Sequence, residues 1–308
     1  MQPKWKKQFE DWRELLGRCA EKSNRKRVHA LRVATLRLKA EVDFRLLDAE
    51  ATSGMGEAVQ RWNKHAKKLR KVLSPVRDTD VHLELLERLR AAQDSVRQEL
   101  TASCIQQIDE LEKGLHQERK GAEKELLKAM QERQDRLERS SRKLEEACIQ
   151  ETAWAETDRA LLIRGIIAGL ATEVNSLNAA TLHEFRKQAK TARYLADISA
   201  RHDSRIARQA ALLKKMQNAA GKWHDLQTLA DKAQDILAAD AESELVGHLK
   251  TLAQQSLDTA LEVCRSAVVE LLALGAWMGT NASLFPPKKP VRSVRAADLK
   301  TGISAATR

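Results

Sequence analysis

Apolar residues recur three or four positions apart along most of the chain, which is the spacing of one side of an α-helix. The first such segment spans about residues 4–22 and carries these apolar residues: Trp5, Phe9, Trp12, Leu15, Leu16 and Cys19. No stretch shows the two-residue alternation that a half-buried strand requires. Residues that favour helices dominate, while Gly, Pro, Tyr and Phe are scarce. The pattern therefore predicts an all-α protein.

Breaks in the pattern predict where the first helices end. Ser23-Asn24 is expected to stop the first helix and to cap a second helix that runs to about residue 48. Ser53–Gly56 is expected to form a turn. Ser74-Pro75 is expected to end the next helix, because proline lacks an N–H donor and restricts the residue before it. Arg77-Asp78 would then lie at the start of a new helix.

The rest of the chain predicts long helices. Residues 81–150 are almost uninterrupted helix formers with Glu and Lys three or four positions apart, and we expect a long helical hairpin there. Gly221 is expected to separate a basic helix from the helix that follows, and residues 241–278 are expected to form a last hairpin. At 308 residues, the chain is long enough for one large helical domain or two smaller ones.

Positive charge is concentrated in particular segments. The net charge is +11 at pH 7, which favours an anionic partner. Residues 25–39 carry six Lys or Arg and residues 61–77 carry seven, and neither stretch contains an acid. Residues 201–222 carry six against Asp203 alone, whereas residues 81–160 mix both signs. Because a solvated helix face usually mixes signs, we interpret the acid-free stretches as a surface for a polyanion.

The basic stretches contain a duplicated arrangement. Its later copy has four members three, four and three positions apart, within an arc of about 80° on one helix face: His183, Arg186, Lys190 and Arg193. The earlier copy comprises His29, Arg32 and Lys39, with Arg37 alongside. Two later segments align at a separation of 147 positions: Lys67-Lys68 with Lys214-Lys215, and Arg77-Asp78 with His224-Asp225. We infer that two related halves hold a long or highly charged anion between them.

Other classes of function lack their residue patterns. The sequence has no GxxxxGK[ST], HExxH or GxSxG motif and no acidic cluster that would hold Mg²⁺ against phosphate. Its four cysteines are far apart, and with no secretory leader we expect reduced thiols in the cytoplasm. The most apolar stretches, 161–170 and 267–278, are too short to span a bilayer. We therefore expect no catalysis, no metal or other cofactor, and no membrane insertion.

The basic motifs resemble those of the CHAD domain, the conserved histidine α-helical domain. Similar to its first half are VHALRV at 28–33 with Arg37 and Lys39, and LSPVRDTDV at 73–81. Similar to its second half are LHEFR at 182–186 with Lys190 and Arg193, KKMQ at 214–217 and WHDL at 223–226. These motifs occur in the family's order, and the resemblance covers roughly residues 5–285.

The resemblance implies a single domain over residues 1–285, with halves of about 1–150 and 151–285. It implies two four-helix bundles related by a pseudo-two-fold axis, with long helical hairpins and a basic central channel. The family binds inorganic polyphosphate in that channel, and its members associate with polyphosphate granules in bacteria and some archaea. Leu36 departs from the family's pattern, which usually has a basic residue here, whereas its counterpart Lys190 is basic.

We expect the duplicated basic residues to contact phosphates. Arginine offers a planar fork of donors, lysine a point charge, and histidine gains charge beside a phosphate. The candidate contacts are His29, Arg32, Arg37, Lys39, Lys64, Lys67, Lys68, Lys71, Arg77, His183, Arg186, Lys187, Lys190, Arg193, Lys214, Lys215 and His224. His224 has two readings, a ligand contact or a capping or orienting residue. Asp78 and Asp225 are expected to orient basic neighbours.

Nucleic acid is the alternative partner, because a protein with a pI near 9.5 also attracts DNA and RNA. Against it, aromatic residues are not spaced along the basic stretches as base stacking requires, and we expect other polyanions to bind weakly. Residues 286–308 are basic and lack an apolar pattern, so we expect a disordered tail. The sequence leaves the oligomeric state open.

Overall fold

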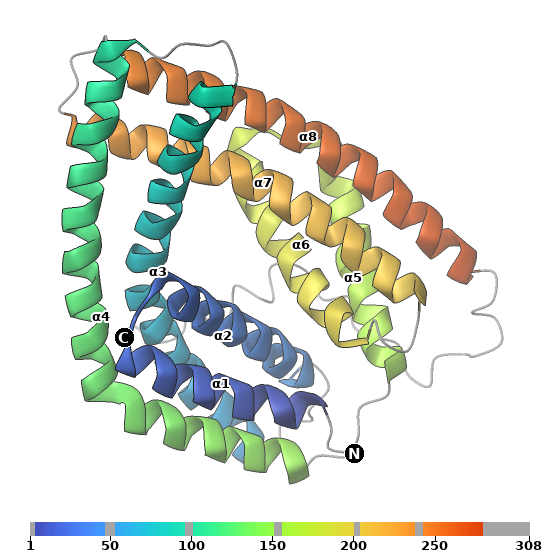
Figure 1. Ribbon diagram of the computed structural model, residues 1–308. Coiled ribbons are helices and arrows are strands. Elements are labelled where there is room, and N and C mark those ends of the chain that lie inside the picture. Colours follow the sequence, from blue (N-terminus) through green and yellow to red (C-terminus); the bar gives the residue numbers. More distant parts are fainter. Residues whose placement is uncertain are drawn as a thin grey trace, which may run out of the picture.

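The computed structural model describes residues 4–46, 53–95, 101–150, 156–199, 204–237 and 243–279. Within these ranges every regular element is a helix, so the predicted all-α class is confirmed. The elements, shown in Figure 1, are α1 (Lys4–Glu21), α2 (Arg25–Leu46), α3 (Ser53–Ser95), α4 (Ala102–Gln150), α5 (Glu156–Glu173), a short 3-10 turn η1 (Val174–Ser176), α6 (Ala179–Ser199), α7 (Ser204–Ile236) and α8 (Glu244–Gly279). The predicted disordered tail, 286–308, lies outside the described residues.

A first hydrophobic core joins α1, α2, the beginning of α3 and the end of α4. Trp12 of α1 is completely buried, and its indole Nε1–H donates to Thr35 Oγ1 of α2 at 2.9 Å. The Trp12 ring also meets the buried Trp62 ring of α3 edge-on, with centroids 6.1 Å apart. Aromatic side chains bury large apolar areas, so these contacts fix α2 and α3 against α1.

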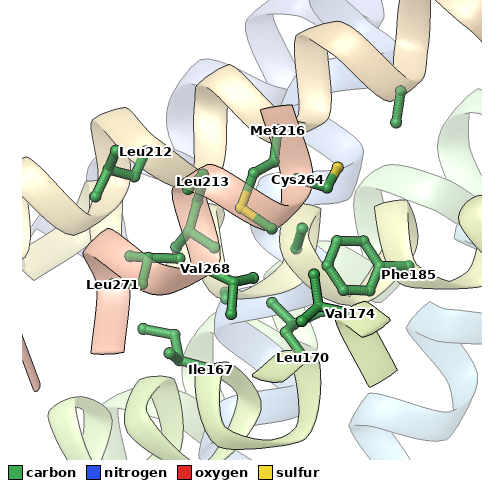
Figure 2. Close-up of a cluster of buried hydrophobic side chains, with 14 of the residues drawn as sticks. Ile167, Leu170, Val174, Phe185, Leu212, Leu213, Met216, Cys264, Val268 and Leu271 are labelled. Carbon is green, nitrogen blue, oxygen red and sulfur yellow. The ribbon is translucent and has the colours of Figure 1, made fainter. Parts of the chain in front are cut away.

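A second core joins α5, α6, the beginning of α7 and the end of α8. Figure 2 shows Leu170 of α5 and Val174 of η1 close to Phe185 of α6, with Ile167 of α5, Met216 of α7 and Cys264 of α8 in the same cluster. Leu36 and Ala40 of α2 also pack against this core. Helix α2 therefore belongs to the N-terminal set of helices and at the same time contacts the C-terminal set.

A third core lies where the far ends of α3, α4, α7 and α8 meet (Figure 1). It is built from the following buried residues: Leu83, Leu86, Cys104, Ile108, Leu111, Leu115, Leu229, Ala230, Ala233, Leu245, Val246 and Leu249. The α3–α4 pair and the α7–α8 pair thus extend beyond their own cores and bury apolar area against each other. This contact gives the first part of α4 a structural role, because its buried residues belong to the third core.

The predicted break at Ser74-Pro75 is wrong, because α3 continues through Pro75. A proline inside a helix leaves the carbonyl four residues earlier without its usual donor. Here that residue is Lys71, which is exposed, as is Pro75, so water can satisfy the carbonyl. Arg77-Asp78 consequently lies in the middle of α3, with its orientation set by a long rigid helix.

Other predicted interruptions are also wrong. Ser53–Gly56 forms the first turn of α3, and Gly221 lies inside a continuous α7. Residues 102–150 form one helix through Gly114, so the expected hairpin over 81–150 is instead the pairing of α3 with α4. Residues 244–279 likewise form one helix, α8, which pairs with α7. Isolated glycines weaken a helix by about 1 kcal/mol, which the tertiary contacts of these long helices outweigh.

Two polar contacts hold the turn between α1 and α2. The predicted cap is confirmed, since Asn24 Oδ1 accepts a hydrogen bond from the Arg27 backbone N–H at 3.0 Å. Arg119 of α4 donates to Asp80 of α3 at 2.7 Å and to the backbone carbonyl of Ser23 at 3.2 Å. Arg119 and Asp80 are largely buried, so this arginine ties α4 and α3 to the start of α2.

Candidate functional site

Basic side chains converge where α2 contacts α6 and α3 contacts α7. We call the following five residues the central basic cluster: Arg32 of α2, Arg77 of α3, and Arg186, Lys190 and Arg193 of α6. They are close enough that Arg32, Arg186, Arg77 and Arg193 all lower the pKa of Lys190, after the larger effect of burial. Helices α2, α3 and α6 therefore contribute cations to one place.

Arg77 is held by carboxylates on two helices. Its Nη1 and Nη2 donate to the two oxygens of Asp225 of α7, at 3.1 and 3.4 Å, and Nη1 also donates to Asp78 at 3.0 Å. Burial disfavours the charged form of Arg77, but Asp225 and Asp78 outweigh it and raise the pKa of the guanidinium. The prediction that the two aspartates orient basic neighbours therefore agrees with the geometry.

Acidic neighbours offset the positive charges of Arg32 and Arg186 less than that of Arg77. Burial lowers the pKa of Arg32 and of Arg186, and Arg77 lowers both further, although Asp225 acts against this. The Nε–H groups of Arg77, Arg186 and Arg193 are buried and have no hydrogen-bond acceptor among the described residues. Buried donors normally have acceptors, so these three N–H groups have unused capacity to bind an oxyanion.

Arg186 lies next to Gly221 of α7. A Cβ atom at Gly221 would lie 3.6 Å from Arg186 Nη2. Arg193 is held on α6 by two contacts. Its Nη1 pairs with Asp197 at 3.3 Å, and its guanidinium lies over the Tyr194 ring, 4.5 Å from the centroid. Arg193 is only 8% exposed, so it is more buried than a residue on an open binding face.

The three predicted histidines lie around the cluster. The rings of His183 and His224 are 4.8 Å apart, and His183 Nδ1 is buried without a partner among the described residues. Burial lowers the pKa of both, with Lys187 next for His183 and Arg186 next for His224. The His29 side chain is in contact with solvent but partly desolvated. This partial burial, then Arg77 and Arg32, lower the pKa of His29. The capping interpretation of His224 is wrong, because this residue lies inside α7.

The predicted lysines outside the cluster are at the surface. Exposed lysines lie on three helices: Lys64, Lys67, Lys68 and Lys71 of α3, Lys187 of α6, and Lys214 and Lys215 of α7. Lys39 forms an ion pair with Asp43, and the Arg37 guanidinium lies 6.0 Å from the Tyr194 ring centroid. The sequence-predicted set therefore divides into the central basic cluster, in which Arg193 is buried and the other four are half-buried, and a group that is mostly exposed.

Sequence analysis missed Arg70 and Tyr194. Arg70 is half-buried with its Nε–H unpaired among the described residues, and its pKa is lowered by burial, raised by Asp43 and lowered by Arg32. Its position seven residues before Arg77 puts both on one face of α3, which is a signal available in the sequence. Tyr194 is buried next to Arg193, and its only sequence signal is that adjacency.

The described ranges contain neither a metal site nor a membrane-spanning helix. No group of three or more His, Cys, Asp or Glu residues there is arranged to hold a metal ion. In the same part of the chain, no helix combines the length and the apolar character needed to cross a membrane.

Most of the chain matches one known family. The profile of the CHAD domain matches residues 4–234, which is well over half of the chain. The chain belongs to the CHAD domain family. A comparison with curated proteins finds no match. The matched part of this CHAD domain protein contains the whole central basic cluster, while α8 begins after it and completes the second and third cores.

Proposed function

We propose that this CHAD domain protein binds inorganic polyphosphate, without catalysis, at the central basic cluster. The observation that supports this most is the convergence of five cations from three helices with three buried, unpaired Nε–H groups. Two carboxylates lie in the same region, Asp78 and Asp225, and both bind Arg77. Cations that are partly withdrawn from water and only partly neutralised are costly to fold, and a bound polyanion relieves that cost.

Polyphosphate fits this arrangement because it repeats one charged unit and presents no base edges. The planar guanidinium groups of several arginines can donate hydrogen bonds to successive phosphates, and no base sequence has to be recognised. We propose that the chain's duplicated basic faces line a channel between two pseudo-symmetric four-helix bundles. The exposed lysines of α3 and α7 would then contact the polymer where it leaves the cluster.

A non-catalytic role is consistent with how the carboxylates are used. Transfer or hydrolysis of phosphate generally needs carboxylates that hold Mg²⁺ against the phosphoryl oxygens. Asp78 and Asp225 instead accept hydrogen bonds from Arg77. Tyr194, the aromatic residue in contact with the cluster cations, is buried under Arg193, so it has no free face on which a nucleobase could stack. This favours polyphosphate over single-stranded nucleic acid.

The proposal is tested with a matched pair of variants. Arg32→Gln with Arg186→Gln removes two charges from the cluster, and Lys120→Gln with Lys124→Gln removes two exposed charges from α4. We expect the first pair to weaken long-chain polyphosphate binding about 100-fold at near-physiological salt, because each charge-assisted hydrogen bond contributes at least 1.4 kcal/mol, or about tenfold. The second pair is expected to change affinity less than about threefold.

The same assay compares ligands. Pyrophosphate should bind far more weakly than long chains, because it engages few donors at once, and long-chain affinity should fall as salt rises. DNA and RNA are added as competitors. Equal affinity for pyrophosphate and long chains, or DNA that displaces polyphosphate at equal charge concentration, would contradict the proposal.

We further propose that binding places the protein at polyphosphate granules. A fluorescent fusion should collect at granules and become diffuse in cells that cannot make the polymer. The Arg32→Gln/Arg186→Gln fusion should be diffuse in both kinds of cell. A fusion that follows the nucleoid regardless of polymer would instead support nucleic acid as the partner.

A further inference from the structure

We propose that Lys190 takes up a proton when the polyanion binds, so that binding weakens as the pH rises above neutrality. This inference rests on the proposed function and adds a regulatory property to the same site. It is carried by the position of Lys190, which lies half-buried on α6 among the arginines of the central basic cluster.

Cations face Lys190 from each neighbouring element of the cluster. α2 contributes Arg32 and, beside the Tyr194 ring, Arg37. His29 of α2 is also close, since Lys190 lowers the pKa of His29. α3 contributes Arg77. α6 itself contributes Arg186 and Arg193. The ring of Tyr194, an uncharged phenol, lies 5.7 Å from Lys190 Nζ. Lys190 is therefore surrounded mainly by groups that repel its charged form.

Carboxylates on α2, α5, α6 and α7 contact residues other than Lys190, and Asp43 of α2 pairs with Lys39. Asp225 of α7 binds Arg77, Glu173 of α5 lies 3.4 Å from the Gln188 amide, and Asp197 of α6 pairs with Arg193. Among the described residues, no carboxylate lies within ion-pair distance of Lys190. Lysine differs from its arginine neighbours because it can lose its proton near neutral pH when it is buried.

Burial, followed by Arg32, Arg186, Arg77 and Arg193, lowers the pKa of Lys190 from 10.5 to about 7. A polyphosphate chain lying on these arginines would add negative charge and return the pKa of Lys190 toward its ordinary value. The protonated form is then favoured by the ligand, so binding takes up a proton at any pH between the two pKa values. The affinity is highest below about pH 7 and falls by up to tenfold per pH unit above it.

The experiment measures the affinity for long-chain polyphosphate at pH 7, 8 and 9 and constant salt. With a pKa of about 7 free and about 10.5 bound, we expect the native protein to bind about 50-fold more weakly at pH 9 than at pH 7. Lys190→Arg keeps the charge and should bind tightly with little pH dependence. Lys190→Met lacks the charge and should bind weakly with little pH dependence.

Lys120→Arg is the matched control. Lys120 is exposed on α4 and is not among the candidate polyphosphate contacts, so this variant should keep the native pH profile. The native protein and Lys190→Arg contain the same histidines. Comparing the pH dependence of their affinities therefore cancels the contribution of the histidines. Calorimetry in two buffers of different ionisation enthalpy should give about 0.9 protons taken up at pH 8 by the native protein.

A direct readout that needs no ligand separates this inference from the proposed function. The Lys190 Cε resonance, assigned by its loss in Lys190→Arg, should titrate near pH 7 in the free protein. Polyphosphate binding that is equally strong at pH 7 and 9 in the native protein overturns the coupling and leaves the proposed function standing. Absence of polyphosphate binding at every pH overturns both, whereas a Lys190 resonance that titrates near 10.5 overturns the inference alone.

Discussion

Replacing Asp225 by Asn should make the protein less stable and, at the same time, a stronger polyanion binder. Asp225 accepts two hydrogen bonds from Arg77, and the two side chains are 18% and 17% exposed. The contact joins α7 to α3 across 148 positions of the sequence. Asparagine has nearly the same size but no charge, so the substitution removes the ion pair without leaving a cavity.

The magnitude follows from the burial and geometry of the pair. A charge-assisted hydrogen bond contributes roughly 1.5–3 kcal/mol, and breaking a fully buried pair costs more, so for this partly buried pair we expect a loss of about 2 kcal/mol. That corresponds to a decrease in Tm of about 4 °C for a chain of this size. For a phosphate bound about 7 Å from Asp225, removing this negative charge should raise affinity about tenfold at low salt.

Thermal unfolding and polyphosphate titration are measured on the same preparations. Asp235→Asn, an exposed position on the same helix, makes the same change in net charge and should alter Tm by less than about 1 °C. A Tm unchanged by Asp225→Asn would show that the ion pair adds nothing to stability. A loss of affinity in a folded Asp225→Asn protein would refute the reasoning, since it would mean that the orientation of Arg77 matters more than the charge of Asp225.

Two further outcomes are expected. A Cβ at Gly114 would lie 2.8 Å from Ile236 Cγ2, so Gly114→Ala should destabilise the protein by about 1 kcal/mol. A Cβ at Gly121 would meet nothing within 4 Å, so Gly121→Ala should stabilise it by about 0.5–1 kcal/mol. Urea unfolding measures both changes. Burial raises the pKa of Cys19 to about 11 and that of Cys264 to about 12. Both thiols should therefore resist iodoacetamide at pH 8 in the native protein and react in urea. Fast labelling of either thiol in the native protein would contradict their burial.

Local sequence patterns were sufficient for the helical class and for the basic faces. Residues three and four apart share a helix face whatever surrounds the helix, so His183, Arg186 and Lys190 could be assigned to one side of α6. The breaks were predicted less well. Pro75 and Gly221 weaken a helix only by local amounts, and packing of α3 and α7 over their whole lengths overrides them.

Burial and partners at the site depended on the tertiary structure. Lys187 and Lys190 are three residues apart on one helix, yet Lys187 is exposed and pairs with Glu184, whereas Lys190 faces Arg32 of α2 and Arg77 of α3. The pairing of Arg77 with Asp225 likewise arises only where α3 crosses α7. The sequence by itself determined which side chains carry charge and which side of a helix they occupy. Only the packing of distant helices decided which charges meet away from water, because desolvation and Coulomb energy depend on neighbours in space.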